Sequence, residues 1–124
     1  MGEAFPIYTW LLDILKTEYD EVCLLKEGPR GSVRLLRHRA TGRRFVLRRF
    51  TGSGEVYRKL LDCACSNLPM IYEVAEGEGE TAVLEEYIQG DTLGFLLQGG
   101  LFTPEQTRKI VLQVCRALWV LHSL

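Results

Sequence analysis

The sequence lacks the features that mark several large classes of protein. Its formal net charge is only −1 over 124 residues, so it has no excess of positive charge of the kind that binds nucleic acid or anionic membranes. No apolar stretch approaches the roughly 20 residues that a membrane-spanning helix needs, and residues 1–16 have neither the basic leader nor the cleavage site of a signal peptide. We therefore expect a cytoplasmic domain with no nucleic-acid partner and no membrane segment.

Cysteine spacing of the kind that binds metal is also missing. The four cysteines, Cys23, Cys63, Cys65 and Cys115, form no C-x-x-C pair, which is the usual spacing of metal ligands and redox motifs. We interpret them as reduced core or surface residues. The sequence therefore predicts no metal site in this chain.

What is present is the composition of one small globular domain, with 47% apolar and 25% charged residues. Alternating apolar and polar residues predict strands over 19–26, 32–38, 44–50, 70–76 and 81–86. Short hairpin-type turns join most of them, which favours an antiparallel sheet. Helical spacing predicts helices over 5–16, 55–63, 92–97 and 103–122. The predicted fold is α+β, with a five-stranded antiparallel sheet, a helix inserted after the third strand, and a short and a long helix after the fifth.

The last predicted helix has the clearest boundary signals. Thr103 is a good N-cap, Pro104 suits the first helical position, and Gln106 completes a capping box. The helix is then apolar on nearly every side, which calls for cover by other surfaces. We expect it to mediate a two-fold homodimer, through side chains that include Val111, Cys115, Leu118 and Trp119.

Two segments carry a resemblance to a known family. Residues 25–33 read Leu-Lys-Glu-Gly-Pro-Arg-Gly-Ser-Val between two predicted strands, and residues 83–93 read Val-Leu-Glu-Glu-Tyr-Ile-Gln-Gly-Asp-Thr-Leu. Their order and spacing resemble the Gly-rich loop and hinge in the small lobe of bacterial Ser/Thr protein kinases. Residues 67–74 resemble the entry to the fourth strand of that lobe, and residues 121–123 resemble the end of the large-lobe helix that precedes the catalytic loop.

The resemblance implies three segments in the chain: a helical extension over 1–17, a kinase-like small lobe over 18–90, and the start of the large lobe over 91–124. It also implies ATP and Mg²⁺ as cofactors of a longer parent protein, whose large lobe would be a missing partner. The catalytic H-R-D motif with an Asn further on does not occur in the sequence. We therefore expect no catalytic residue, no tightly bound cofactor and no phosphoryl transfer from residues 1–124 alone.

The resemblance also assigns residues to a nucleotide site. Gly28 and Gly31 match the second and third glycines of the loop, where backbone N–H groups approach ATP phosphates, and Lys26 stands in place of the first. Leu25 and Val33 match the apolar residues that cover the adenine.

The third strand and the hinge complete this assignment. Val46 and Arg48 lie on one face of the strand that ends in the family's lysine. Arg48 is a departure, since a planar guanidinium is not equivalent to an ammonium at a phosphate-binding position. In the hinge, the resemblance assigns adenine binding to the carbonyl of Glu86 and the backbone N–H and carbonyl of Ile88.

Two further choices stay open from the sequence. The family's helix glutamate is best matched by Glu55, which is equally suited to the first turn of a helix. The alternative is that Arg48 pairs not with the helix glutamate but with Glu85 on the fifth strand, which neighbours the third strand in the resembled fold. One ion pair then explains two departures from the family pattern. Asp91 either reaches a ribose or caps the following helix, and we favour the cap.

Three functions remain compatible with the sequence. The first is the ATP-binding lobe of an active Ser/Thr kinase. The second is a pseudokinase that regulates or scaffolds without phosphoryl transfer. The third is an interaction module built on a kinase-like sheet.

Overall fold

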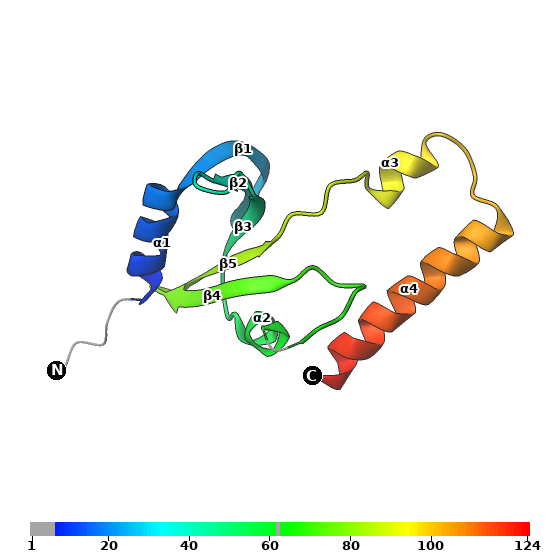
Figure 1. The fold of residues 1–124 in the computed structure, drawn as a ribbon. Helices are drawn as coiled ribbons and strands as arrows, with labels where there is room; N and C mark the ends of the chain where they lie inside the picture. The colour runs from blue at the N-terminus through cyan, green and yellow to red at the C-terminus, as the bar shows by residue number, and fades with distance from the viewer. Residues whose placement is uncertain (1–6, 62) are drawn as a thin grey trace. The chain divides into compact units, whose positions relative to one another are not determined.

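The computed structural model describes residues 7–61 and 63–124 (Figure 1). Within them, in chain order, lie α1 (Ile7–Glu18), β1 (Tyr19–Gly28), β2 (Gly31–His38), β3 (Arg44–Thr51), α2 (Glu55–Leu60), β4 (Ile71–Gly77), β5 (Glu80–Glu86), α3 (Leu93–Leu97) and α4 (Pro104–Ser123). Residues 1–6 of the predicted extension, including the start of the helix predicted over 5–16, lie outside the described part. The elements form two compact units, one holding α1, the sheet and α2, the other holding α3 and α4.

The sheet confirms the predicted antiparallel architecture. Its strand order is β1-β2-β3-β5-β4, and every neighbouring pair is antiparallel. The β1–β2 hairpin turns over Pro29 and Arg30 between the paired Gly28 and Gly31. The β4–β5 hairpin turns over Glu78 and Gly79, with φ of 56° and 77°; two successive positive φ values match the right-handed twist of the strands that the turn joins.

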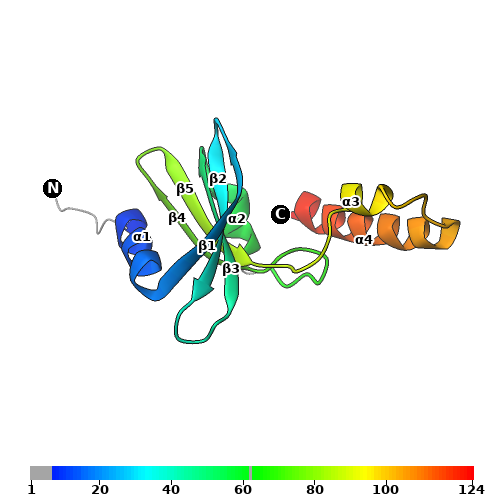
Figure 2. The same ribbon diagram turned by 90° about the horizontal axis from the view of Figure 1, so that it is seen from above.

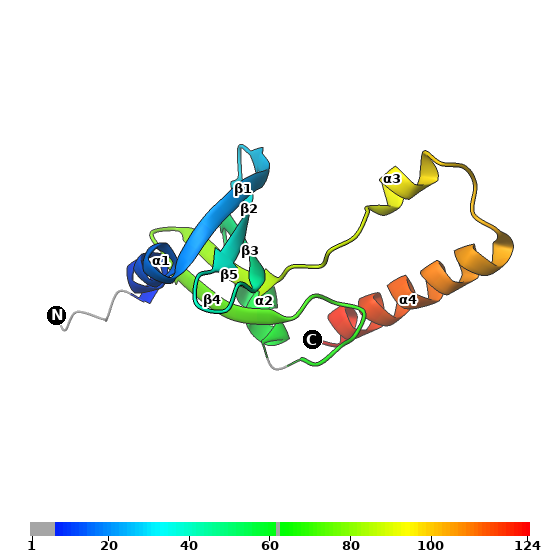
Figure 3. The same ribbon diagram turned by 45° about the horizontal axis from the view of Figure 1, so that its top comes forward.

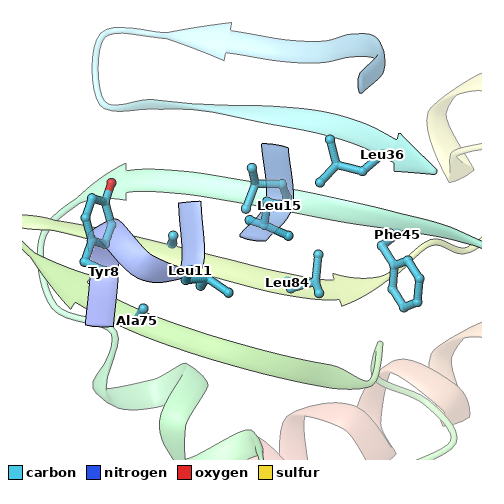
Figure 4. Close-up of a cluster of buried hydrophobic side chains, with 9 residues drawn as sticks. Tyr8, Leu11, Leu15, Leu36, Phe45, Ala75 and Leu84 are labelled. Atoms are coloured by element: carbon cyan, nitrogen blue, oxygen red, sulfur yellow. The ribbon is translucent and has the colours of Figure 1, made fainter. Parts of the chain in front are cut away.

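One face of the sheet packs against α1. In Figure 2 α1 and α2 lie on opposite faces of the sheet. Alternation along each strand places every second side chain toward α1, and Figure 4 shows Tyr8 at one end of the resulting cluster and Phe45 at the other. The cluster consists of Tyr8, Leu11, Leu15, Leu36, Phe45, Leu47, Ala75, Ala82 and Leu84. Fully burying a Leu or Phe side chain stabilises a fold by roughly 1.5–3 kcal/mol, so this cluster fixes α1 to the sheet.

A polar contact also holds the N-terminal end of α1. The Tyr8 hydroxyl donates to Glu80 Oε1 at 2.6 Å, and Arg49 Nη2 donates to Tyr8 Oη at 3.1 Å and to Glu80 Oε1 at 3.2 Å. The hydrogen bond from Tyr8, aided by Arg49, lowers the pKa of Glu80. Burial, followed by the bond to Glu80, raises the pKa of Tyr8. An ionised Glu80 thus helps to attach α1.

The segment before α2 packs closely on the other face of the sheet. A Cβ at Gly54 would lie 2.6 Å from Thr81 Cγ2, so only glycine fits without displacement. The Thr81 hydroxyl donates to the carbonyl of Gly52 at 2.6 Å. Arg58 on α2 pairs with Glu76 on β4 at 2.8 Å, and Figure 3 shows α2 beside β4.

Helix α2 is shorter than predicted. The prediction over 55–63 was wrong beyond Leu60, because Leu61 N bonds to the carbonyl of Arg58 and Cys63 N to that of Leu60. These tightened three-residue turns end the helix, and the Asp, Cys, Ser and Asn residues that follow have low helix propensity. Residue 62 lies outside the described part.

In the second unit, the capping box of α4 is confirmed. Thr103 Oγ1 accepts from Gln106 N at 3.1 Å, and Gln106 Oε1 accepts from Thr103 N at 2.9 Å. The cap of α3 is a correction: Thr92, and not Asp91, accepts from Phe95 N at 3.1 Å. Thr92 is one residue nearer to the first turn, so its short hydroxyl reaches the N–H three residues on. None of the described helices is both long and apolar enough to span a bilayer.

The β1–β2 turn generates a prediction about two glycines. A Cβ at Gly31 would lie 2.0 Å from the Arg49 carbonyl oxygen, whereas one at Gly28 would meet nothing within 4 Å. We expect Gly31→Ala to lower the free energy of unfolding by about 2 kcal/mol, through forced separation of the β2 and β3 backbones. The matched control Gly28→Ala should change it by no more than about 0.5 kcal/mol. Equal urea midpoints for the two variants would contradict the close approach.

The contact at Tyr8 generates a prediction about pH. Because Glu80 has a lowered pKa in the folded state, its contribution is present above the ordinary glutamate pKa of about 4.3 and is lost as the pH falls through the lower folded-state value. We expect Glu80→Gln to reduce stability at pH 7 by about 0.5–1 kcal/mol, discounted for exposure. In urea titrations, the difference from the native chain should shrink toward zero in acid. A difference that grows below pH 4 would refute this role.

Candidate phosphate-binding groove

A groove of about 440 Å³ lies under the β1–β2 turn. The hairpin, β3 and α2 together form its walls, so residues 31 positions apart in sequence come together at one place. Its lining consists of Lys26, Gly28, Pro29, Arg30, Gly31, Ser32, Val33, Arg48, Arg49, Phe50 and Tyr57. Phe50 and Tyr57 are in ring contact at 5.7 Å, which joins α2 to the end of β3 and closes one side of the groove.

The charge of the groove is positive. Lys26 and Arg30 line it together with Arg48, whose guanidinium bonds to Glu85. None of the described lining residues is an aspartate or glutamate. Arg49 also lines it, but its guanidinium bonds to Tyr8 and Glu80. Cations gathered around a concave surface attract anions. The groove can therefore hold a small anionic group such as a phosphate.

The structure brings four of the predicted nucleotide-site residues together here and leaves the others out of the lining. Gly28, Gly31, Val33 and Arg48 all line the groove. Leu25 does not, because β1 has an irregularity between Leu24 and Lys26: Leu24 pairs with Arg34, and Lys26 pairs with Val33. Leu25 is the extra residue of a β-bulge, so Lys26 takes the place that the sequence assigned to Leu25.

The space available for a side chain differs between the two glycines of the turn. Gly31 is required by the sheet, since a Cβ at this position would overlap the Arg49 carbonyl oxygen and the Phe50 Cα. Gly28 has open space around the position of a Cβ. Packing therefore explains Gly31 and leaves Gly28 as the glycine whose bare backbone is available to a ligand.

Arg48 and Glu85 form the fork that strand alternation predicts. Arg48 Nε donates to Glu85 Oε2 and Arg48 Nη2 to Glu85 Oε1, both at 3.1 Å. In the β3–β5 register, Val46 faces Glu85 and Arg48 faces Val83, so the pair is diagonal on one face of the sheet. The hydrogen bonds that Arg48 donates to Glu85 raise the pKa of Arg48. Glu55, the alternative partner, pairs with Lys59 one helical turn away at 3.5 Å.

The remaining predicted residues lie near the ends of strands. Val46 is buried beside the fork on the same face. The Glu86 carboxylate accepts from Met70 N at 3.0 Å, which ties the end of β5 to the start of β4 and leaves the Glu86 carbonyl as the predicted adenine acceptor. Ile88 is exposed and belongs to the second unit.

Sequence reasoning missed Arg30 and Tyr57 as parts of the groove. The sequence indicated Arg30 only as part of a turn, and Tyr57 only as a neighbour of the apolar positions of the predicted helix. In this two-residue hairpin the second turn residue, Arg30, lies over the groove. The short length of the turn was the sequence signal that could have located Arg30 there. No cluster of three or more His, Cys, Asp or Glu suited to a metal occurs in the described residues.

Comparisons with known proteins bear on the fold. No family model matches the sequence, and no curated protein matches it either. Solved structures do match, among them the crystal structure of residues 1–466 of Rad53, a Ser/Thr protein kinase, in complex with AMP-PNP. The two share 18% sequence identity with a TM-score of 0.73 over 88% of this chain. The fold is that of a protein-kinase small lobe. The chain spans 31% of that Rad53 chain.

The fork generates a prediction about stability. The Glu85 side chain is 8% exposed and that of Arg48 is 36% exposed. Arg48→Met therefore leaves a buried carboxylate without a partner, and we expect a loss of roughly 2–4 kcal/mol. Glu85→Gln should cost less, because the half-exposed guanidinium can turn toward water.

The double variant Arg48→Met/Glu85→Met serves as the control. Removing both charges avoids the buried unpaired carboxylate, so urea unfolding should show most of the loss recovered. If the double variant were as unstable as the sum of the single ones, the fork would not be the cause.

Proposed function

We propose that this chain is the ATP-binding small lobe of a Ser/Thr protein-kinase-like protein, with the phosphates of the nucleotide in the groove under the β1–β2 turn. The observation that supports this most is the positive groove itself. It lies between the glycine-containing hairpin and β3. Lys26 and Arg30 line it beside the paired Arg48, and none of the described lining residues is a carboxylate.

The residues of the groove suit a polyphosphate. Ammonium and guanidinium groups are the side chains that bind phosphate oxygens, and Gly28 leaves its backbone open to a ligand. Val33 and Val46 supply apolar surface on the same face, as an adenine requires. In this proposal the Glu86 carbonyl accepts a hydrogen bond from the adenine edge.

Magnesium fits the described residues less well. Mg²⁺ is bound by oxygen ligands, usually one or two carboxylates together with phosphate, and none of the described residues that line the groove is a carboxylate. We therefore assign no step to a metal held by these residues.

A pseudokinase role is the second candidate, and the Arg48–Glu85 fork favours it. Two N–H groups of Arg48 are already bonded to Glu85, so fewer remain for phosphates. The α2 glutamate that would pair with this position, Glu55, bonds to Lys59 instead. In an active kinase the β3 cation and the helix glutamate form an ion pair.

The long helix α4 offers a surface for a partner. Val111, Val114, Leu118 and Trp119 are exposed to 44% or more, and clustered apolar side chains of that kind favour contact with another protein surface. We propose that the large lobe of a longer parent protein covers them. The homodimer through 103–122 stays a prediction.

Calorimetric titration of residues 1–124 with ATP tests the main proposal. Because Lys26, Pro29 and Arg30 are exposed, we expect a dissociation constant of about 1 mM or weaker, and no phosphate transfer to a protein substrate. A low-micromolar constant with Mg²⁺ would contradict this, because it requires roughly 4 kcal/mol more binding energy.

Variants locate the binding. Lys26→Gln and Arg30→Gln should each weaken ATP binding roughly two- to five-fold by removing one exposed charge contact. Lys109→Gln, the same change on exposed α4, should leave it unchanged. Equal binding by all three variants would place ATP elsewhere.

A further inference from the structure

A second pocket lies on the α1 side of the sheet, on the face opposite the groove. It has a volume of about 260 Å³ and is lined by four aromatic residues, Trp10, Tyr19, Phe45 and Tyr72. Phe45 is buried, Tyr19 and Tyr72 are partly buried, and Trp10 is half exposed. In Figure 4, Phe45 stands at the end of the core cluster away from Tyr8. The pocket therefore opens where the cluster meets solvent.

The rings pack edge to face around Phe45. The centroids of Tyr19 and Phe45 are 5.7 Å apart with an interplanar angle of 78°, and those of Phe45 and Tyr72 are 5.2 Å apart at 80°. Such pairs hold each other in fixed orientations. The rings thus form a rigid aromatic surface in the pocket. The faces of these rings are electron-rich and attract cations.

Arg43 already places a guanidinium against this aromatic surface. The guanidinium carbon of Arg43 lies 5.2 Å from the centroid of the Phe45 ring, and Arg43 Nη2 lies 3.4 Å from Tyr72 Oη. Arg43 is exposed, on the short segment between β2 and β3, and a hydrogen bond of 3.4 Å is long. Arg43 therefore occupies the pocket loosely and can be displaced.

Two carboxylates make the pocket negative. Glu18 and Glu73 line it, and Arg43 is the only basic residue among the described residues of the lining, so their formal charge is −1. The same charged groups affect the pKa of Tyr19. Burial raises this pKa most, Glu18 and Glu73 raise it further, and Arg43 lowers it. Glu18 also lies 3.7 Å from His38 Nε2. One additional positive charge would neutralise the pocket.

We propose that this pocket binds an arginine side chain of a partner protein. Its volume is below the roughly 300–1,000 Å³ of pockets for small-molecule ligands, which fits a single side chain. A guanidinium is planar, stacks on aromatic faces and is weakly hydrated, and Arg43 already places this group on Phe45. Glu18 and Glu73 supply the complementary charge. This surface does not involve the groove, so the proposal is independent of nucleotide binding.

A titration with two matched peptides tests the proposal. One is a Gly-Ser peptide with a single central arginine, and the other carries citrulline at that position, which keeps the shape and removes the charge. The chain has two tryptophans, so in a Trp119→Phe background the indole N–H signal in an NMR spectrum reports on Trp10 alone. We expect the arginine peptide to shift the Trp10 signal with weak, saturable binding that salt reduces. The citrulline peptide should shift it little, and equal shifts from both peptides would overturn the proposal.

Three variants are expected to change the affinity for the arginine peptide in different ways. Glu73→Gln removes an attracting charge and should weaken binding roughly two- to five-fold. Arg43→Gln removes the competing guanidinium and raises the negative charge, so it should strengthen binding by a similar factor. Glu78→Gln, the same change in the exposed β4–β5 turn, should leave binding unchanged. Weaker binding by Arg43→Gln, or equal effects of Glu73→Gln and Glu78→Gln, would show that the pocket does not bind arginine.

Discussion

The first unit depends on the strand β3, which is buried on both faces over residues 45–47. This strand lies in the middle of the sheet between β2 and β5, and its side chains alternate strictly between two different environments. Phe45 and Leu47 enter the cluster under α1, whereas Val46 and Arg48 face the side that bears the groove. A shift of one residue in this register would exchange the two sets and put a guanidinium into the apolar cluster. The aromatic pocket and the groove therefore owe their composition to the same register.

The sequence predicted those parts of the fold that depend on local chemistry. Alternation itself predicted the five strands, and Thr103 and Gln106 predicted the capping box. Each of these follows from a spacing that the chain carries within one element. Nothing about the rest of the molecule needs to be known for them. The prediction of the Arg48–Glu85 fork needed, besides alternation, the strand neighbours that the kinase resemblance implies.

What the sequence did not predict depends on departures from regular geometry. The bulge at Leu25 moves Lys26 to the groove, and a bulge inserts one residue without a distinctive sequence signal here. Helix α2 ends early because three-residue hydrogen bonds replace four-residue ones after Arg58. Thr92 and not Asp91 caps α3, since both residue types are good caps and only the backbone decides between them. The aromatic pocket combines residues of α1, β1, β3 and β4, so no single stretch of sequence contains it.

Ion pairs neutralise several arginines of the arginine-rich segment over 34–49. Arg34 pairs with Glu21 at 2.9 Å and Arg39 with Asp20 at 2.8 Å, so the acidic residues of β1 neutralise basic residues of β2 and of the turn that follows. Arg48 is held by Glu85 and Arg49 by Glu80, at 3.1 and 3.2 Å. Lys26 and Arg30, which line the groove, come from the β1–β2 hairpin and not from the basic segment of β2 and β3. A chain with a net charge of −1 can in this way present a small positive groove on one face of the sheet and a small negative pocket on the other. Such local separation of charge suits selective contact with two different ligands, because the field of each site acts over only about one Debye length, roughly 8–10 Å at physiological salt.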